Sequence, residues 1–417
     1  MLKNYFRIAW RTLTRHKTYT LINILGLTLG ICSCLVIWLI AKYEFSFDRF
    51  HPDKEHIYRI ITSEQLTDNS PVQLLPAVIP PVADALQETI PGIEKVAPYH
   101  ILFDGKVNVP ANASNPFPFP SRPIVAGPEY FNIMKYDWLA GDERTALSEP
   151  FKVVLSEKKA RLYFGSAPLD RLIGRELVYN DSLHVRVAGI IREWKENTDF
   201  PYTEFISLAT ARHGLLQHSL QLDQTRWKGV PFSSRILLRL GQKADPVSVN
   251  AAIGTLFHQR WRQKGMALAL QPLTSVHFTE AGGEAEVRTA HLPTLYALMS
   301  IALFILILAI INYVNLATAQ SLSREKEIGI RKVLGSSRTS LVFQFLLETS
   351  LLTIFAVGLA CLLVKPVLTA FRSFIPSAVR FDLFSPSTLF FLAGVVGVTT
   401  VLAGLYPARF LSAYLPV

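Results

Sequence analysis

The chain has 417 residues and a formal net charge of +10, and 50% of its residues are hydrophobic while only 18% are charged. A soluble protein usually has about a quarter charged residues, so this composition excludes a wholly soluble globular protein. The apolar content excludes a disordered chain. With only 3 cysteines, all inside apolar runs, the sequence also excludes a disulfide framework.

The basic excess lies outside one long segment. Residues 42–290 contain 28 Lys+Arg and 28 Asp+Glu, which leaves 14 basic and 4 acidic residues in the rest of the chain. A nucleic-acid-binding protein usually carries its positive charge on a folded domain. Here the basic residues flank apolar runs, which is how membrane proteins fix their orientation. We therefore expect membrane lipid as a partner and no nucleic acid.

Residues 1–17 predict an amphipathic N-terminal helix. Lys3, Arg7, Arg11 and Arg15 recur every four residues and form one cationic stripe. Such a helix would lie in the headgroup region and bind anionic lipid. An ordinary cytoplasmic extension of the first membrane span is the alternative.

Four apolar runs predict transmembrane helices at residues 18–41, 293–318, 340–364 and 387–407. A helix of the first length reaches about 36 Å, enough to cross a hydrocarbon core of about 30 Å. Its apolar part is longer than the core of a signal peptide, about 7–15 residues, so we expect it to be retained. The basic tail 1–17 and the basic loop 319–338 predict a cytoplasmic location for both, and for the tail 408–417. Residues 42–290 and the loop 365–386 are then extracytoplasmic.

Residues 42–290 predict a mixed α+β domain with βα repeats, in two subdomains. The fold class is therefore a membrane protein with four transmembrane α-helices and a large α+β extracytoplasmic domain inserted between helices 1 and 2. The proline-rich stretch 110–123 predicts a loop, because proline is excluded from central strands. The predicted strands are 57–61, 93–100, 153–155, 176–179, 183–191, 235–240 and 266–271, and the predicted helices are 77–90, 157–164 and 246–264.

No motif for catalysis is present in the sequence. Gly-x-Ser-x-Gly, His-Glu-x-x-His, Cys-x-x-Cys and the phosphate-binding loop are all absent. His51 and His56 are five residues apart and do not share a helical face, so we interpret them as surface or loop residues rather than zinc ligands. We expect no enzyme activity, no cofactor and no metal, and any use of ATP requires a separate ATPase.

The most specific stretch of the sequence joins the second and third predicted spans. Residues 323–338 place acidic residues early and basic residues late, which suits the dipole of a short helix. Gly335 can end that helix, and Ser336 or Ser337 can then cap the third span. The simpler alternative is a loop whose basic residues only fix orientation, but that alternative does not explain a helix with a stop and a restart.

This stretch, Arg324–Gly335 followed by Gln344–Glu348, resembles the FtsX-like/MacB-type ABC transporter permease family. Further stretches that are similar to the family are Asn4–Leu13, Ile22–Gly30, Val153–Gly165 and Leu270–His277. The last two resemble its periplasmic core domain. The resemblance covers essentially the whole chain, and its motifs occur in the family's order.

The resemblance implies a permease subunit in the bacterial inner membrane. In such permeases the loop between spans two and three is a coupling helix that docks on a cytoplasmic ABC ATPase, and the ATP-driven motion is transmitted to the extracytoplasmic domain for export or extraction of a substrate. An FtsX-like regulator that activates an extracytoplasmic partner, such as a cell-wall hydrolase, without transport is the alternative. Carried over to this sequence, the ATPase-coupling residues are Arg324, Glu325, Lys326, Glu327, Ile328, Gly329, Ile330, Arg331, Lys332, Leu334 and Gly335.

The chain departs from many relatives in its length, because they carry a second copy of the span and domain pattern. One copy implies a second permease copy, as a homodimer or a sister subunit, or else a fragment of a longer protein. A periplasmic adaptor is a further implied partner. The sequence leaves the substrate open among lipoprotein, peptide, macrolide-like drug and control of a hydrolase.

Glu348 is an acidic residue inside the third predicted span. Ionisable groups in spans are costly and suggest function. Because it lies only about 15 Å along the helix from Arg338, we favour a structural role over a proton relay. Asn312 and Asn315 of the second span are its predicted partners.

Overall fold

The computed structural model describes residues 17–65, 70–102, 105–110, 118–211, 220, 227, 230–261, 265–281, 288–323 and 337–413. The chain divides into two compact units. One unit contains the long helices from both ends of the chain, and the other is the segment between them, Ser46–His291. The predicted helix at 1–17 falls almost wholly outside the described residues, as does the predicted coupling segment 324–335.

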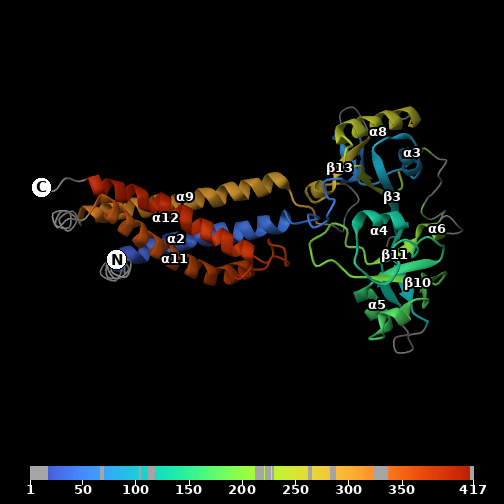
Figure 1. The fold of residues 1–417 in the computed structure, drawn as a ribbon, viewed down its shortest axis with the longest axis horizontal. Helices are drawn as coiled ribbons and strands as arrows, with labels where there is room; N and C mark the ends of the chain where they lie inside the picture. Colours follow the sequence, from blue (N-terminus) through green and yellow to red (C-terminus); the bar gives the residue numbers. More distant parts are fainter. Residues whose placement is uncertain are drawn as a thin grey trace. The chain divides into compact units, whose positions relative to one another are not determined.

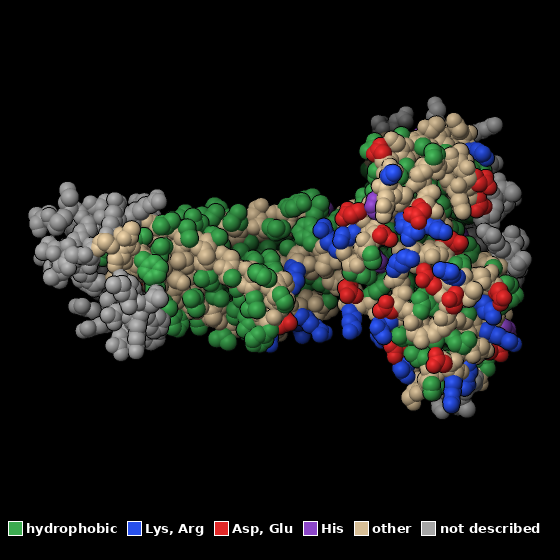
Figure 2. Space-filling view, in the orientation of Figure 1, with side chains coloured by type: hydrophobic (Ala, Val, Ile, Leu, Met, Phe, Trp, Pro, Cys, Tyr) green, Lys and Arg blue, Asp and Glu red, His purple; other side chains and the backbone are tan. Residues whose placement is uncertain are grey.

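The helical unit consists of four long helices that run side by side (Figure 1). All four are long and apolar enough to cross a membrane, which confirms the fold class predicted from the sequence. The surface that they present is largely apolar (Figure 2), as a lipid-facing surface requires. The helices are α2 (Lys17–Glu44), α9 (Leu292–Ser323), α11 (Arg338–Ala370) and α12 (Pro386–Ala413).

The third long helix continues past its predicted end. α11 passes through Pro366 and stops at Ala370, where the sequence predicted an end at residue 364. Proline removes one backbone hydrogen bond, and helices in membranes tolerate that loss when their neighbours support the backbone. The loop before α12 is therefore 371–385.

Each of the four long helices packs against two of the others. α2 packs against α9 and α11, and α12 packs against the same two helices. Leu27, Ile31 and Leu35 of α2 are fully buried in the shared apolar core. Gly30 permits the close approach of α9, because a Cβ added there would lie 2.8 Å from the Cβ of Ala309. Small residues have this role in membrane helix packing.

The folded unit is built on one mixed sheet. Within the described residues thirteen strands join it, in the order β13-β1-β12-β3-β6-β11-β8-β10-β9-β4-β5, with β2 on β1 and β7 on β10. Two strand pairs are parallel, β8 with β10 and β6 with β11. The strands are β1 (Ile57–Glu64), β2 (Gln73–Leu75), β3 (Ile93–Ile101), β4 (Gly105–Asn108), β5 (Phe119–Ser121), β6 (Ile124–Ala126), β7 (Trp138–Gly141), β8 (Lys152–Ser156), β9 (Glu176–Tyr179), β10 (Leu183–Ile191), β11 (Glu204–Ser207), β12 (Ser234–Leu240) and β13 (Met266–Pro272).

Short helices cover this sheet. α3 and α8 bury their apolar faces in one hydrophobic cluster with β1 and β12, α4 belongs to a second cluster, and α5 to a third. The helices are α3 (Pro81–Thr89), α4 (Pro128–Met134), α5 (Glu157–Phe164), α6 (Leu208–Ala211) and α8 (Pro246–Arg260), with short 3-10 turns η1 (Leu169–Leu172) and η2 (Leu273–Phe278).

The strand–helix unit predicted at residues 153–165 is confirmed. The Ser156 hydroxyl accepts a hydrogen bond from the Lys159 N–H (3.3 Å) and caps α5. Gly165 ends the helix with a φ of +70°. β9 and β10 form the predicted antiparallel hairpin, and Asn180 and Asp181 both have positive φ in its turn.

Several elements differ from the sequence predictions, and three of these differences have a local explanation. α3 begins at Pro81 rather than residue 77, because proline has no N–H to donate within a helix and is favoured in the first turn, where that N–H is not needed. α8 ends at Arg260, because the backbone of Trp261 is extended. The stretch 110–123 contains β5, which the sequence did not predict. β5 is the last strand of the sheet, the edge position where Pro120 is tolerated.

The close packing at Gly30 generates a matched pair of variants. Gly30→Ala forces α2 and α9 apart, so we expect it to destabilise the helical unit by about 1–3 kcal/mol. Gly358→Ala in α11 meets open space and should be neutral or slightly stabilising, because alanine is the better helix former. Thermal unfolding of the two purified full-length variants in detergent measures the difference. Equal melting temperatures would contradict the proposed contact.

Candidate functional site

The predicted coupling residues, 324–335, lie outside the described residues, so their helix stays a prediction. The structure does describe both flanks of the segment. α9 ends at Ser323, and α11 begins after Ser337. The Ser337 hydroxyl accepts a hydrogen bond from the Ser340 N–H (3.3 Å), which confirms the predicted capping of the third span.

A polar group inside the helical unit links α9 to α11. The hydroxyls of Tyr313 and Thr349 are 3.0 Å apart, and both residues are buried. Glu348, the residue before Thr349, is also buried, with 7% of its surface exposed. Hydroxyl contacts between membrane helices each contribute about 1 kcal/mol. The link therefore fixes the position of α11 near Glu348 relative to α9.

The structure describes both asparagines that the sequence predicted as partners of Glu348. Asn312 and Asn315 are both exposed on α9. The side-chain nitrogen of Asn312 lies 3.6 Å from the position that a Cβ would take at Gly26, which places it beside α2. The residue of this region that reaches α11 is Tyr313, which sequence reasoning missed. A pairing of Glu348 with Asn312 or Asn315 stays a prediction.

A second polar residue that the sequence did not single out is Asn23 of α2. It is 1% exposed, and neither of its amide atoms has a hydrogen-bond partner in the part of the chain that the structure describes. A buried amide without partners costs several kcal/mol. Asn23 is therefore a polar position inside the bundle with unused hydrogen-bonding capacity.

In the folded unit, the residues that follow α2 enter a buried polar cluster, here called the base anchor (Phe47, Asp48, His51, Asp199 and His277). Asp48 is completely buried. Its carboxylate accepts hydrogen bonds from the Thr198 hydroxyl (2.5 Å) and from the Asp199 N–H (3.0 Å). Its own N–H donates to the Asn197 carbonyl at 3.0 Å. The first turn after the first span is therefore fixed to the loop that follows β10.

His277 of η2 connects the base anchor to the other end of the folded unit. Its Nδ1 lies 2.9 Å from the Asp199 carboxylate, and its ring stacks on Phe47 with centroids 3.6 Å apart. Its backbone carbonyl accepts a hydrogen bond from the Ala290 N–H at 2.8 Å. Ala290 lies two residues before α9 begins. The chain segments that lead from α2 and into α9 therefore both attach to His277.

The base anchor is electrostatically unusual because two carboxyl groups are buried together. Burial raises the pKa of the Asp199 carboxyl, and the hydrogen bond from His277 opposes that effect without cancelling it. The Asp48 carboxylate raises the same pKa further, while the buried Arg59 guanidinium lowers it. The Arg59 Nε donates to the Gln271 side chain, so β1 and β13 hold this positive charge in place.

His51 lies in a loop, as one of the two predicted alternatives had it, but it is not at the surface. It is 2% exposed, and its Nε2 lies 3.7 Å from the Asp48 carboxylate. Its ring contacts Phe50 (4.1 Å between centroids) and Trp194 (4.9 Å). The aromatic side chains provide an apolar wall that a spacing argument on His51 and His56 cannot detect. Among the described residues no group of three or more His, Cys, Asp or Glu side chains has the arrangement of a metal site.

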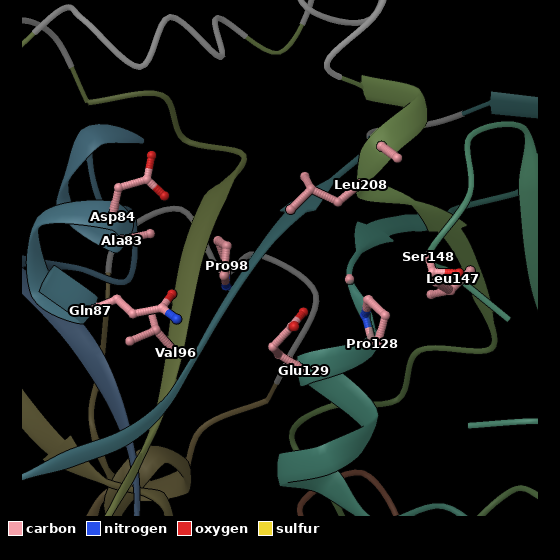
Figure 3. Close-up of a pocket in the computed structure, with 12 residues that line it drawn as sticks. Ala83, Asp84, Gln87, Val96, Pro98, Pro128, Glu129, Leu147, Ser148 and Leu208 are labelled. Atoms are coloured by element: carbon pink, nitrogen blue, oxygen red, sulfur yellow. The ribbon is translucent and has the colours of Figure 1, made fainter. Parts of the chain in front are cut away.

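The folded unit also has a cleft of about 260 Å³ between α3 and α4 (Figure 3). Gln87 of α3 and Glu129 of α4 lie on its opposite walls, and Pro98 of β3 lies between them. Asp84 and Ser148 add polar groups, and the remaining lining is mostly apolar. The cleft combines the carboxylates of Asp84 and Glu129 with apolar side chains of the same walls.

The comparisons with known proteins agree with this architecture. The family model described as MacB-like periplasmic core domain matches residues 20–256, and that described as FtsX-like permease C-terminal matches residues 299–416. The chain is 21% identical over 368 residues to the macrolide export ATP-binding/permease protein MacB of Escherichia coli, covering 85% of this chain and 51% of that protein. The chain thus spans about half the length of the curated relatives it matches.

Two solved structures are also similar. A permease domain from Porphyromonas gingivalis has 17% sequence identity and a TM-score of 0.43, covering 60% of this chain and 99% of that one. The periplasmic region of MacB from Actinobacillus actinomycetemcomitans has 15% identity and a TM-score of 0.37, covering 51% and 87% respectively.

The class of protein is therefore a multi-pass membrane permease with a domain of periplasmic type. The chain belongs to the MacB/FtsX-type ABC transporter permease family, because the periplasmic core model alone matches more than half of it and the permease model matches the helices that follow.

The base anchor generates a test on the folded unit. Asp48→Ala leaves the Thr198 hydroxyl and the Asp199 N–H without their buried acceptor, so we expect a loss of about 2–4 kcal/mol in the unfolding free energy. Urea unfolding of the full-length protein, followed by tryptophan fluorescence, measures it, and Trp194 in contact with His51 is a local reporter.

Asp137→Ala is the matched control for this variant. Asp137 pairs with Arg192 at 3.5 Å, and both side chains are more than half exposed. Exposed pairs contribute at most about 1 kcal/mol. If the Asp48 and Asp137 variants lose the same stability, the base anchor does not hold the folded unit as described.

Proposed function

We propose that this chain is the permease subunit of an ABC transporter complex, and that it transmits the motion of a separate cytoplasmic ATPase to its folded domain for export or extraction of a substrate. The observation that carries the proposal is the presence of both family domains on one chain, in order, with the folded domain inserted between α2 and α9. A relative named as an ATP-binding/permease protein joins the two activities in one chain. In the proposed complex the ATPase is a partner subunit.

The proposed site of ATPase docking is Arg324–Gly335. This segment joins α9 and α11, and the basic residues of the loop and of the N-terminal tail favour a cytoplasmic position for both. The residues 42–290 are then on the extracytoplasmic side of the bacterial inner membrane. Alternating acidic and basic side chains at the docking segment would select the partner through charge complementarity.

The contacts inside the helical unit support a path for the transmitted motion. α11, which begins directly after the docking segment, is linked to α9 by the hydroxyls of Tyr313 and Thr349. It is linked to α2 by a hydrogen bond from the Thr28 hydroxyl to the Ala356 carbonyl (3.3 Å). Because α2 and α9 are the helices that continue into the folded domain, a shift of α11 acts on both.

The base anchor supports the last step of this path. The segments next to α2 and α9 both attach to His277 inside the folded domain, through Phe47 and Ala290. A displacement of either segment therefore acts on the same buried group. One copy supplies four helices, and we propose that a second permease copy, identical or a sister subunit, completes the complex; a periplasmic adaptor fits the same scheme.

Charge reversal in the docking segment tests the proposal. We expect Glu327→Lys with Arg331→Glu to reduce co-purification of the ATPase at least tenfold and to abolish its stimulation, because complementary charges become repulsive. Pull-down from membranes and ATPase assays in proteoliposomes measure both effects.

The control for this reversal is Glu157→Lys with Arg161→Glu in α5. This pair has the same spacing and an N–O distance of 3.1 Å on the surface of the folded unit. Its reversal should leave the ATPase bound. A complex that survives the Glu327 and Arg331 reversal intact would refute the coupling assignment. A complex that stimulates ATPase but moves no substrate would favour the FtsX-like regulator.

Glu348→Gln tests the structural role assigned to Glu348. Glutamine keeps the size and hydrogen-bonding capacity of the side chain but cannot carry a proton between two sites. We expect normal expression and ATP-linked activity within about twofold of the parent. A side chain with a purely structural role is replaced at little cost by one of the same size and shape. A folded variant without ATP-linked activity would support a proton relay instead.

A further inference from the structure

The loop between α11 and α12 lies at the level where membrane helices meet water. In the first turn of α12, Ser387 accepts a hydrogen bond from the Lys42 ammonium group (2.6 Å). Lys42 also lies 5.3 Å from the ring centre of Trp38, which stacks on Phe391 at 4.5 Å. Tryptophan and lysine concentrate at membrane interfaces. The loop 371–385 therefore lies at the interface on the side where α2 leads into the folded domain.

One side of this loop is fixed to the helical unit. Ile375, Val379 and Phe381 pack against the apolar core of the four helices. The Ile375 N–H donates to the Phe371 carbonyl (3.1 Å), and the Val379 N–H donates to the Pro376 carbonyl (3.0 Å). These residues form the inner side of the loop, and the remaining residues form its outer side.

The outer side, here called the loop lipid face (Phe371, Arg372, Phe374, Arg380 and Phe384), combines aromatic and basic side chains. Phe374 and Phe384 are 83% and 82% exposed, and Phe371 is 53% exposed. Arg372 and Arg380 are exposed and form no ion pair with another described residue. The nearby acid, Asp382, accepts a hydrogen bond from the Phe384 N–H at 3.0 Å.

The same composition continues onto the neighbouring helices. Phe390 of α12 is 81% exposed, and Lys365 of α11 is exposed one and a half turns before the loop. Figure 2 shows apolar side chains along the helices and Lys or Arg side chains gathered at one end of them. Large exposed aromatic groups are stable at this level only when a partner removes them from water.

We propose that the loop lipid face binds phospholipid of the leaflet on the side of the folded domain, with anionic headgroups preferred. The phenylalanine rings enter the upper acyl region, and Arg372 and Arg380 bind the lipid phosphates through charge-assisted hydrogen bonds. Lipid is the favoured occupant because the face is continuous with lipid-facing helices and its charge is complementary to phosphate. The inference is independent of the ATPase and of any substrate.

Bromolipid quenching of Phe374→Trp tests the inference. The full-length variant is placed in phosphatidylcholine vesicles that carry bromine at shallow or deep acyl positions, and the parent fluorescence is subtracted. We expect shallow bromine to quench the added fluorescence at least twofold more than deep bromine. Phe384→Trp is the second variant, in case the first does not fold. Phe232→Trp, a 57% exposed position of the folded unit, is the aqueous reference.

The charge preference has its own measurement. At one-tenth of the lipid, brominated phosphatidylglycerol should quench the added fluorescence at least twofold more than the same fraction of brominated phosphatidylcholine. Arg372→Gln with Arg380→Gln should remove that difference. Equal quenching by both lipids would overturn the role of the two arginines.

Two other results would overturn the proposal as a whole. Quenching of the added fluorescence by aqueous acrylamide without any effect of bromolipid would show that the loop faces water. Resistance to both quenchers would show that protein, such as a second copy, covers the face. Quenching of the parent tryptophan fluorescence, to which Trp38 of the helical unit contributes, is an internal check that bromolipid has reached the protein.

Discussion

The contact between His277 and the segments next to α2 and α9 is the constraint on which the folded unit depends. Phe47 stacks on the His277 ring, Asp199 holds its Nδ1, and Ala290 donates to its carbonyl. Both segments end on one buried residue of the folded unit, so displacing them within that unit breaks buried hydrogen bonds, which are costly to leave unpaired.

The polar character of the base anchor has a physical consequence. Apolar contacts are not directional, so an anchor built from leucine and valine would allow sliding. Asp48 instead accepts two hydrogen bonds of defined geometry, and its neighbour Asp199 keeps a raised pKa because burial outweighs the hydrogen bond from His277. Burial of these carboxyl groups lowers stability through desolvation, and the directional hydrogen bonds fix the position of the chain around Asp48.

Much of the fold was predictable from the sequence because its signals are local. Four apolar runs, the Ser156 cap of α5 and the turn at Asn180 and Asp181 each depend on neighbouring residues, and the structure confirms them. The start of α3 and the edge strand around Pro120 were mispredicted. Proline excludes some backbone conformations and hydrogen bonds, but it does not determine where a helix begins or whether a segment pairs at the edge of a sheet. The coupling residues 324–335 lie outside the described residues and stay predictions.

The candidate sites show where local reasoning ends. His51 was interpreted as a surface or loop residue, and it does lie in a loop, yet Trp194 from a distant part of the chain and the adjacent Phe50 enclose its ring. Tyr313 was missed beside Asn312. In a helix that is apolar on all sides, the sequence pattern does not show which side packs against the neighbouring helices. His277 was included in a family-like stretch, Leu270–His277, but its partner Asp199 is 78 residues away.

In the helical unit, a few polar and close contacts determine how the long helices pack in an apolar environment. Lipid tails are as apolar as leucine, so apolar contacts alone position membrane helices weakly. Close approach at Gly30 and the hydroxyl hydrogen bonds of Tyr313 with Thr349 and of Thr28 with Ala356 therefore have a large share in setting how α2, α9 and α11 pack. At the end of the helices, Lys42 and Ser387 perform the same task beside Trp38. The loop 371–385 combines the two kinds of contact. Its inner apolar residues pack against the four helices, and its outer arginines and phenylalanines bind the lipid interface in the proposed arrangement.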